Sequence, residues 1–269
     1  MSNIVGVISI KGGVGKTSCV ASLGAVLAES FNKRVLLVDA NFTAPNLAFH
    51  YGLVDVPVTL HHVLTGSRTI MKAIYEYNKK LHILPGSLLG KKINPFLLRK
   101  ELNTLREFYD IILIDSSPNL NNEIMATMIA ADELLVITTP DYPTLSCTMH
   151  AIKIAKERKT PITGIILNKM RNKSFELTIE DIEDCCKVPV IGYLPDDISM
   201  LESLAHSKPV SLHSPLSNAS IELHKLAAAL VNQQYKDPRF FSQFKQWITK
   251  DVRKDEVNRD VLRQRQNHW

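Results

Sequence analysis

Short runs of apolar, largely β-branched residues alternate along the chain with segments whose apolar positions recur at helical spacing. Most of these runs are almost continuously apolar, which is typical of strands that are buried on both faces of a sheet. We therefore expect strands over residues 4–10, 34–39, 82–84, 110–115, 133–138, 162–167 and 190–194.

The segments between these runs predict helices, because their apolar residues recur every three or four positions. We expect helices over residues 16–30, 95–108, 120–131, 143–159, 175–187 and 217–234. Such an alternation predicts an α/β fold with a doubly wound, mainly parallel sheet and helices on both faces. Ligands of these sheets bind beyond the carboxyl ends of the strands, so a site is expected where the strands end.

A glycine-rich loop follows the first predicted strand. It reads Lys11-Gly12-Gly13-Val14-Gly15-Lys16-Thr17-Ser18. Three glycines within four positions allow a tight turn that aims backbone N–H groups at a phosphate, and the following helix adds the positive end of its dipole. Lys16 would reach the β- and γ-phosphates, and the Thr17 hydroxyl would bind Mg²⁺. The loop therefore predicts a nucleoside triphosphate site.

This loop departs from the usual G-x-x-x-x-G-K-[ST] pattern, because Ile10 stands where the first glycine belongs and Lys11 adds a second lysine. With that lysine it resembles the deviant Walker A motif of the MinD/ParA-type ATPases, above all their MinD-like branch. The resemblance covers residues 1–234. It implies a P-loop NTPase fold, ATP and Mg²⁺ as cofactors, and an ATP-dependent homodimer in which Lys11 reaches the partner's phosphates.

Two of the predicted strands end in carboxylates. Asp115 follows the apolar run 111–114, where a strand-end carboxylate can hold a Mg²⁺-bound water beside the triphosphate. A lone aspartate there is more often a turn or helix-cap residue, but the glycine-rich loop upstream favours the metal role. Asp39 closes the run 35–38 and resembles the start of the family's first switch. The resemblance thus implies a metal site of Thr17, Asp39 and Asp115.

The first switch differs from the family at one position. MinD-like proteins usually read Asp-x-Asp, with the second carboxylate near the attacking water, whereas this chain has Asn41 there. An amide can orient water but cannot take its proton. Since phosphoryl transfer depends mainly on positioning and charge neutralisation, we expect slow hydrolysis, with Lys11, Lys16, Asp39 and Asn41 as the catalytic group.

Two further strand ends resemble the base-binding positions of the family. Asn168-Lys169 follows the predicted strand 162–167, and Pro195-Asp196-Asp197 follows the predicted strand 190–194. In the family, the asparagine side chain reads the adenine edge and the backbone after the proline closes over the base. The resemblance therefore implies ATP rather than GTP.

Composition narrows the class of protein. A chain of 269 residues with 45% hydrophobic and 22% charged residues fits one main globular domain. No apolar run is long enough to span a bilayer, and no signal-like segment opens the chain, so we expect a cytoplasmic protein. The four cysteines lack C-x-x-C spacing, which argues against a disulfide framework, a zinc site and the paired cysteines of iron–sulfur carriers.

The basic charge lies at the C-terminal end. Residues 232–269 hold nine Lys or Arg against five Asp or Glu, within a chain of net charge +5. A polar linker after Val231 separates the predicted ATPase domain, 1–234, from a basic amphipathic helical tail, 235–269. A helix would gather the apolar residues of the tail into one stripe. These residues are Phe240, Phe241, Phe244, Trp247, Ile248 and Val252.

Two readings of the tail stay open. Aromatic anchors and flanking cations between residues 239 and 252 suit an anionic membrane surface, and MinD proteins carry a C-terminal membrane-binding helix. The family's helix lies at the extreme end, however, whereas a charged stretch follows here from Asp251 to Trp269. Docking on the chain's own domain or on a partner is the alternative that we favour slightly.

The function expected from the sequence is a weak ATPase that positions or regulates a cellular structure. ATP-dependent homodimerisation would switch it between forms that bind or release a regulator or cargo protein. A ParA-type partition ATPase that binds DNA nonspecifically through phosphate contacts is one alternative. A non-hydrolysing ATP-sensing scaffold is another, because of Asn41.

Overall fold

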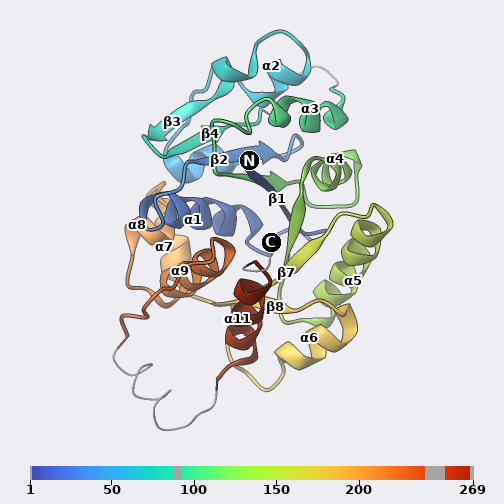
Figure 1. Ribbon diagram of the computed structural model, residues 1–269, viewed down its shortest axis with the longest axis vertical. Coiled ribbons are helices and arrows are strands. Elements are labelled where there is room, and N and C mark those ends of the chain that lie inside the picture. Colours follow the sequence, from blue (N-terminus) through green and yellow to red (C-terminus); the bar gives the residue numbers. More distant parts are fainter. Residues whose placement is uncertain (1, 88–92, 240–251, 267–269) are drawn as a thin grey trace.

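The computed structural model describes residues 2–87, 93–239 and 252–266 and places an eight-stranded sheet between two layers of helices (Figure 1). The strands lie in the order β3-β4-β2-β5-β1-β6-β7-β8. All neighbouring strands pair in parallel except β3 and β4, which are antiparallel. The prediction of a doubly wound, mainly parallel sheet is thereby confirmed. The strands are β1 (Asn3–Ile8), β2 (Val35–Ala40), β3 (Tyr75–Asn78), β4 (Leu81–Leu84), β5 (Ile111–Ser116), β6 (Glu133–Thr138), β7 (Ile162–Met170) and β8 (Val190–Pro195).

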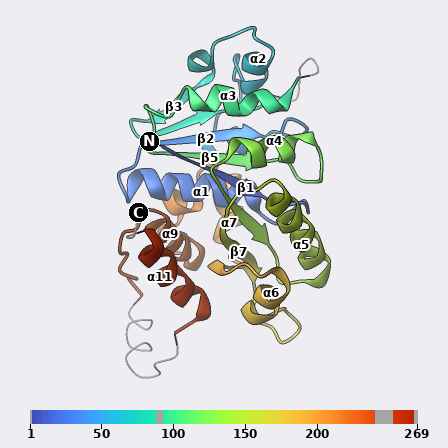
Figure 2. The ribbon, with the colours of Figure 1, turned by 45° about the vertical axis from the view of Figure 1, so that its right-hand side comes forward.

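Helices cover both faces of the sheet. The longer ones are α1 (Lys16–Glu29), α4 (Asn122–Ala130), α5 (Tyr142–Glu157), α6 (Ile179–Cys186), α9 (Asn218–Leu230) and α11 (Lys254–Gln266). The shorter ones are η1 (Leu47–Tyr51), α2 (Leu60–Leu64), η2 (Ile70–Ala73), η3 (Pro95–Leu97), α3 (Leu98–Asn103), α7 (Ser199–Ala205) and α8 (Val210–His213). One layer contains α1, α8 and α9, and the other contains α2 to α6 (Figures 1 and 2).

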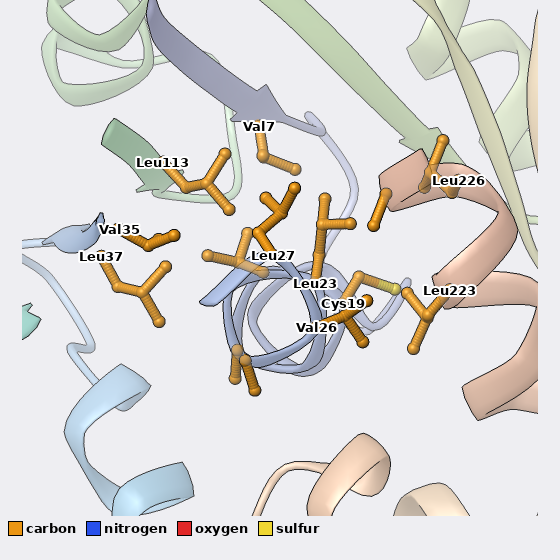
Figure 3. Close-up of a cluster of buried hydrophobic side chains, with 14 of the residues drawn as sticks. Val7, Cys19, Leu23, Val26, Leu27, Val35, Leu37, Leu113, Leu223 and Leu226 are labelled. Carbon is orange, nitrogen blue, oxygen red and sulfur yellow. The ribbon is translucent and has the colours of Figure 1, made fainter. Parts of the chain in front are cut away.

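The core explains how the first helix is held. Alternate residues of β2 point to opposite faces of the sheet, so that Leu37 packs with α1 while Leu36 joins the core of the other layer. Figure 3 shows α1 between the sheet and α9, with Leu23 and Leu27 near the strand residues and Cys19 near Leu223. Each fully buried leucine contributes about 2 kcal/mol of hydrophobic stabilisation. This packing fixes the start of α1 against the carboxyl edge of the sheet.

Some predicted boundaries were wrong. β1 ends at Ile8 rather than residue 10, because the chain already turns there toward the glycine-rich loop. The helix predicted over 95–108 is reduced to η3 and α3, since bonds of the i to i−3 kind follow Asn103. α6 begins at residue 179 rather than 175, because Thr178 caps it in a capping box with Asp181.

Helix α11 lies beside β8, at the edge of the sheet, and beside α9 (Figures 1 and 2). The Nδ2 of Asn258 donates to the carbonyl of Val190 at 2.9 Å, and the Nη1 of Arg259 donates to the carbonyl of Ile191 at 3.1 Å. Arg259 also pairs with Asp255 at 2.6 Å, and both side chains are buried. α11 therefore covers carbonyl groups of an edge strand. The predicted apolar stripe, apart from Val252, lies outside the described residues.

A cluster of charges fixes the chain on both sides of residues 240–251. The buried carboxylate of Glu222, on α9, pairs with Arg239 at 2.7 Å and with Arg253 at 2.8 Å. Lys225, one turn along α9, pairs with Asp237 at 2.9 Å. Burial raises the pKa of Glu222, but Arg253 and Lys225 lower it more, so its net direction is downward. Within the described part of the chain, no helix is long and apolar enough to cross a membrane.

Candidate nucleotide-binding site

The glycine-rich loop joins β1 to α1 at the carboxyl edge of the sheet. Gly13 and Gly15 adopt left-handed backbone angles, with φ of 78° and 88°. A Cβ atom at Gly15 would also overlap the side-chain amide of Asn168. Both reasons make glycine the residue that fits this position. Gly15 is the N-cap of α1 and no side chain caps the helix, so the N–H groups of its first turn can bind an anion.

The second lysine of the loop lies in a buried ionic cluster. The Nζ of Lys16 is 2.9 Å from a carboxylate oxygen of Asp115 and also donates to the carbonyl of Ser116. The Thr17 hydroxyl donates to the other oxygen of Asp115 at 2.7 Å. Lys16 and Asp115 are 7% and 0% exposed, so little water screens their attraction. The structure thus brings together the three residues predicted to hold phosphate and metal at this end of the site.

Asp39 faces the same cluster from the neighbouring strand. It pairs in register with Asp115 across β2 and β5 and is almost completely buried. One of its carboxylate oxygens accepts the N–H groups of Asn46 and Leu47, at 2.9 and 3.0 Å, and the other accepts the N–H of Asn41 at 3.1 Å. Burial and the charge of Asp115 raise the pKa of Asp39 to about 7, against the lowering effect of its backbone hydrogen bonds.

The chemistry of these groups fits a magnesium ion. Thr17, Asp39 and Asp115 offer hydroxyl and carboxylate oxygens, the ligands that Mg²⁺ prefers, and a cation would offset the repulsion of the two neighbouring carboxylates. The described residues contain no group of three or more His, Cys, Asp or Glu that could hold a metal ion. A Mg²⁺ bound by few protein ligands would take its remaining ligands from substrate phosphates and water.

The side chain of Asn41 is engaged within its own loop. Its Nδ2 donates to the carbonyl of Ala44 at 2.7 Å, and its Oδ1 accepts the N–H of Ala44 at 3.2 Å. Both polar atoms of the amide therefore have a partner within three residues. The water-orienting role of Asn41 stays a prediction, in which its second amide N–H or the other lone pair of its Oδ1 would bond the water.

Lys11 lies apart from the buried cluster. Its ammonium donates to the hydroxyl of Thr144 at 2.7 Å and to the carboxylate of Asp141 at 3.2 Å, both at the start of α5. Although burial raises the pKa of Asp141, hydrogen bonds from Thr139, Thr144 and Lys11 lower it to about 2. The side chain of Lys11 is 39% exposed. Lys11 thus bonds within its own chain while remaining accessible at the mouth of the loop.

Two of the residues predicted to bind the base contact the backbone of the glycine-rich loop. The Nδ2 of Asn168 donates to the carbonyl of Val14 at 2.7 Å, and the Nζ of Lys169 donates to the carbonyl of Gly13 at 2.8 Å. Both side chains therefore support the loop backbone. A contact of Asn168 with adenine stays a prediction, in which its second amide N–H or its Oδ1 would bond the base.

The loop after β8 forms the adjacent wall. Asp196 pairs with Arg171 at 2.6 Å, between the ends of β7 and β8. Asp197 accepts the backbone N–H groups of Ser199 and Ala219, each at 3.0 Å, and thereby joins the starts of α7 and α9. The carboxylate of Asp197 thus holds the two helix starts together. Contact with a ligand would then come from the backbone of this loop.

These parts surround one cavity of about 790 Å³, a volume in the range of nucleotide and cofactor sites. Asp39 and Asp115 do not line it, but they bond to residues that do, Asp39 to the N–H groups of Asn41 and Asn46 and Asp115 to Lys16 and Thr17. The predicted residues that line it are Lys11, Gly12, Gly13, Val14, Gly15, Lys16, Thr17, Ser18, Asn41, Asn168, Lys169, Pro195, Asp196 and Asp197. Residues that the sequence did not point to also line it, namely Asn46, Phe49, His50, Pro118, Arg171, Met200, Leu201 and Leu204. Their spacing in the chain carries no recognisable pattern.

Comparison with known proteins finds a matching family and relatives that include ATP-binding proteins and MinD proteins. A protein family described as an AAA domain matches residues 2–165. An uncharacterized ATP-binding protein of Methanocaldococcus jannaschii is 32% identical over 253 residues, which cover 91% of this chain and 96% of that protein. The septum site-determining protein MinD of Synechocystis is 31% identical over 242 residues, which cover 87% of this chain and 91% of that protein.

A solved structure shares the fold. The septum site-determining protein MinD of Pyrococcus horikoshii, complexed with Mg-ADP, matches with a TM-score of 0.81 and 31% sequence identity. The match covers 86% of this chain and 96% of that one. The family match over residues 2–165 spans the glycine-rich loop and both strand-end aspartates.

Proposed function

Because the chain belongs to the MinD/ParA family of P-loop ATPases, we propose that it is a slow ATPase that uses ATP-dependent homodimerisation to position or regulate a cellular structure. A regulator or cargo protein would bind one of its two states. Relatives named for septum-site determination and for ATP binding support this proposal.

ATP and Mg²⁺ fit the cavity and its charges. The free N–H groups at the start of α1 and the ammonium of Lys16 would bind the phosphates, and Thr17, Asp39 and Asp115 would hold the ion. When bound, Mg²⁺ neutralises charge that develops on the transferring phosphoryl group. Lys16 would exchange its contact with Asp115 for the β- and γ-phosphates.

The position of Lys11 is the observation that carries the dimer proposal. Its ammonium lies at the mouth of the loop, outside the buried cluster of Lys16 and Asp115. An accessible cation there can reach a second molecule's phosphates, whereas Lys16 is enclosed by its own chain. A charge supplied in trans makes the nucleotide part of the interface, so hydrolysis would release the dimer.

Light scattering tests the dimer directly. We expect Mg²⁺ and ATP to double the 30.2 kDa mass of the chain, while Mg²⁺ and ADP leave it unchanged. Lys16→Ala should stay monomeric because it loses phosphate binding. Lys11→Ala should bind ATP in calorimetry and yet stay monomeric. Equal masses in all conditions would contradict the proposal, and a Lys11→Ala dimer would contradict the role of this lysine.

A further inference from the structure

One buried polar side chain of the cavity has no place in the scheme above. His50, on η1, lines the cavity and is 5% exposed. The described residues show no hydrogen bond to its imidazole ring, and the ring nitrogens are not among their enclosed polar atoms without a partner. The ring is therefore open to the cavity, where it can bond a ligand.

The backbone around His50 is anchored at both ends of η1. Upstream, the N–H of Leu47 donates to the carboxylate of Asp39 at 3.0 Å. Downstream, the hydroxyl of Tyr51 donates to the carbonyl of Ala21, on α1, at 2.6 Å. These contacts fix η1 between the metal-side carboxylate and the helix that follows the glycine-rich loop. The position of His50 is therefore set in advance of any ligand.

The contact of η1 with Asp39 places His50 toward the phosphate end of the cavity, because His50 follows three residues after Leu47, whose N–H donates to that carboxylate. Burial lowers the pKa of His50, and the charge of Asp115 opposes this effect. Asp115 is the carboxylate that binds Lys16 and Thr17. A neutral imidazole keeps one N–H donor, which can bond a phosphate oxygen.

We propose that His50 donates a hydrogen bond to an oxygen of the terminal phosphate of bound ATP, and so helps the protein to distinguish ATP from ADP. The inference rests on the proposed function, since it requires ATP in this cavity. It makes His50 a specificity-determining residue of the first switch region, in a loop where the amide of Asn41 is already engaged with Ala44.

Calorimetry with a non-hydrolysable ATP analogue and with ADP, each with Mg²⁺, tests the inference. His50→Leu should weaken binding of the ATP analogue about tenfold, because a hydrogen bond to a charged group contributes at least that factor, and should change ADP binding less than twofold. His50→Gln should retain most of the analogue's affinity, because its amide can still donate. His150→Leu, an identical change on the exposed face of α5, should alter neither affinity.

The ADP measurement also serves as the folding control, because a His50→Leu protein that binds ADP with nearly unchanged affinity has an intact nucleotide site. Equal weakening of both ligands by His50→Leu, or no weakening of either, would overturn the inference. If the wild-type chain binds neither nucleotide, the proposed function itself fails. If the wild-type chain binds both and His50→Leu shows no selective loss, the inference alone fails.

Discussion

A single buried carboxylate links the chemistry of the site to the stability of the fold. Burial and the neighbouring charge of Asp115 raise the pKa of Asp39 from 3.8 to about 7. The folded chain then holds this proton more tightly than the unfolded chain does. Between about pH 4 and pH 7 the free energy of unfolding should therefore fall as pH rises, by up to about 4 kcal/mol.

Urea unfolding of the nucleotide-free protein in EDTA, at pH 5 and pH 8, measures this effect. Other groups also titrate over that range, so the comparison is with Asp39→Asn, which keeps an oxygen for the N–H groups of Asn46 and Leu47. We expect Asp39→Asn to be more stable than the wild type at pH 8 and to depend less on pH. Identical pH dependence of the two proteins would rule out this role of Asp39.

The amide at position 41 gives a second prediction for a single residue. Asn41→Asp supplies a carboxylate that can accept a proton, and it retains an acceptor for the N–H of Ala44. It also loses the donor that bonds the carbonyl of Ala44, which frees the side chain to turn toward the cavity. We expect phosphate release to accelerate about tenfold.

The matched control for this change is Asn32→Asp, which alters the charge in the same way at an exposed residue of the turn between α1 and β2, away from the cavity. It should leave the rate unchanged. A rate for Asn41→Asp at or below that of the wild type would show that positioning of the nucleotide, rather than proton acceptance, limits turnover.

The sequence indicated the type of each strand-end residue but not its partners. Thr17 and Asp115 were both predicted at the metal site, and only the structure shows the hydrogen bond that joins them. The bond of Asn41 to Ala44 and the contact of Lys11 with Asp141 depend on the path of loops, which residue spacing does not encode. His50 was not predicted as a site residue, because a lone histidine in an apolar run is usually part of the hydrophobic core.

At the scale of elements, α11 is held by polar contacts more than by apolar ones. Its buried pair of Arg259 and Asp255 is joined to the carbonyl of Ile191 on β8. Removing one partner of a buried pair leaves a charge without compensation. We expect Arg259→Leu to lower the free energy of unfolding by about 3 kcal/mol, measured by urea unfolding and circular dichroism.

Arg263→Leu is the matched control, because Arg263 pairs with Asp260, whose side chain is 64% exposed. Exposed pairs contribute about 1 kcal/mol or less, so this change should be small. If Arg259→Leu leaves the unfolding midpoint where it was, α11 does not unfold together with the sheet.

Elements differed in how far the sequence predicted them. The ends of the buried strands were located within three residues, because a short, continuously apolar run between turn residues is typical of a strand covered on both faces. β3 was missed, since its sequence is polar and a bulge interrupts its pairing between Glu76 and Asn78. α7 and α8 were missed because so few residues cannot establish a helical period. In the tail, the aromatic stripe lies outside the described residues apart from Val252, so the helix expected there stays a prediction, and the charged segment 254–266 forms the helix that the structure describes.

At the scale of the whole molecule, the order of the strands assembles the site. β1 lies between β5 and β6, so the glycine-rich loop leaves the middle of the sheet, with Asp115 on one neighbour and Asp39 one strand further on. Parallel strands end at the same edge, which brings residues more than seventy positions apart into one cavity. The sequence predicted this convergence because it follows from fold class alone.

The contact of Lys11 with Asp141 and Thr144 also acts as an internal competitor for association. In the proposed dimer, each lysine leaves this contact before it reaches the other molecule's phosphates. A half-exposed pair of this kind is worth about 1 kcal/mol or less, equivalent to about a fivefold change in an equilibrium constant. In the proposed dimer, the apparent affinity of the two subunits for each other would therefore be lower than their interface alone would give, because each subunit first loses its own Lys11 contacts.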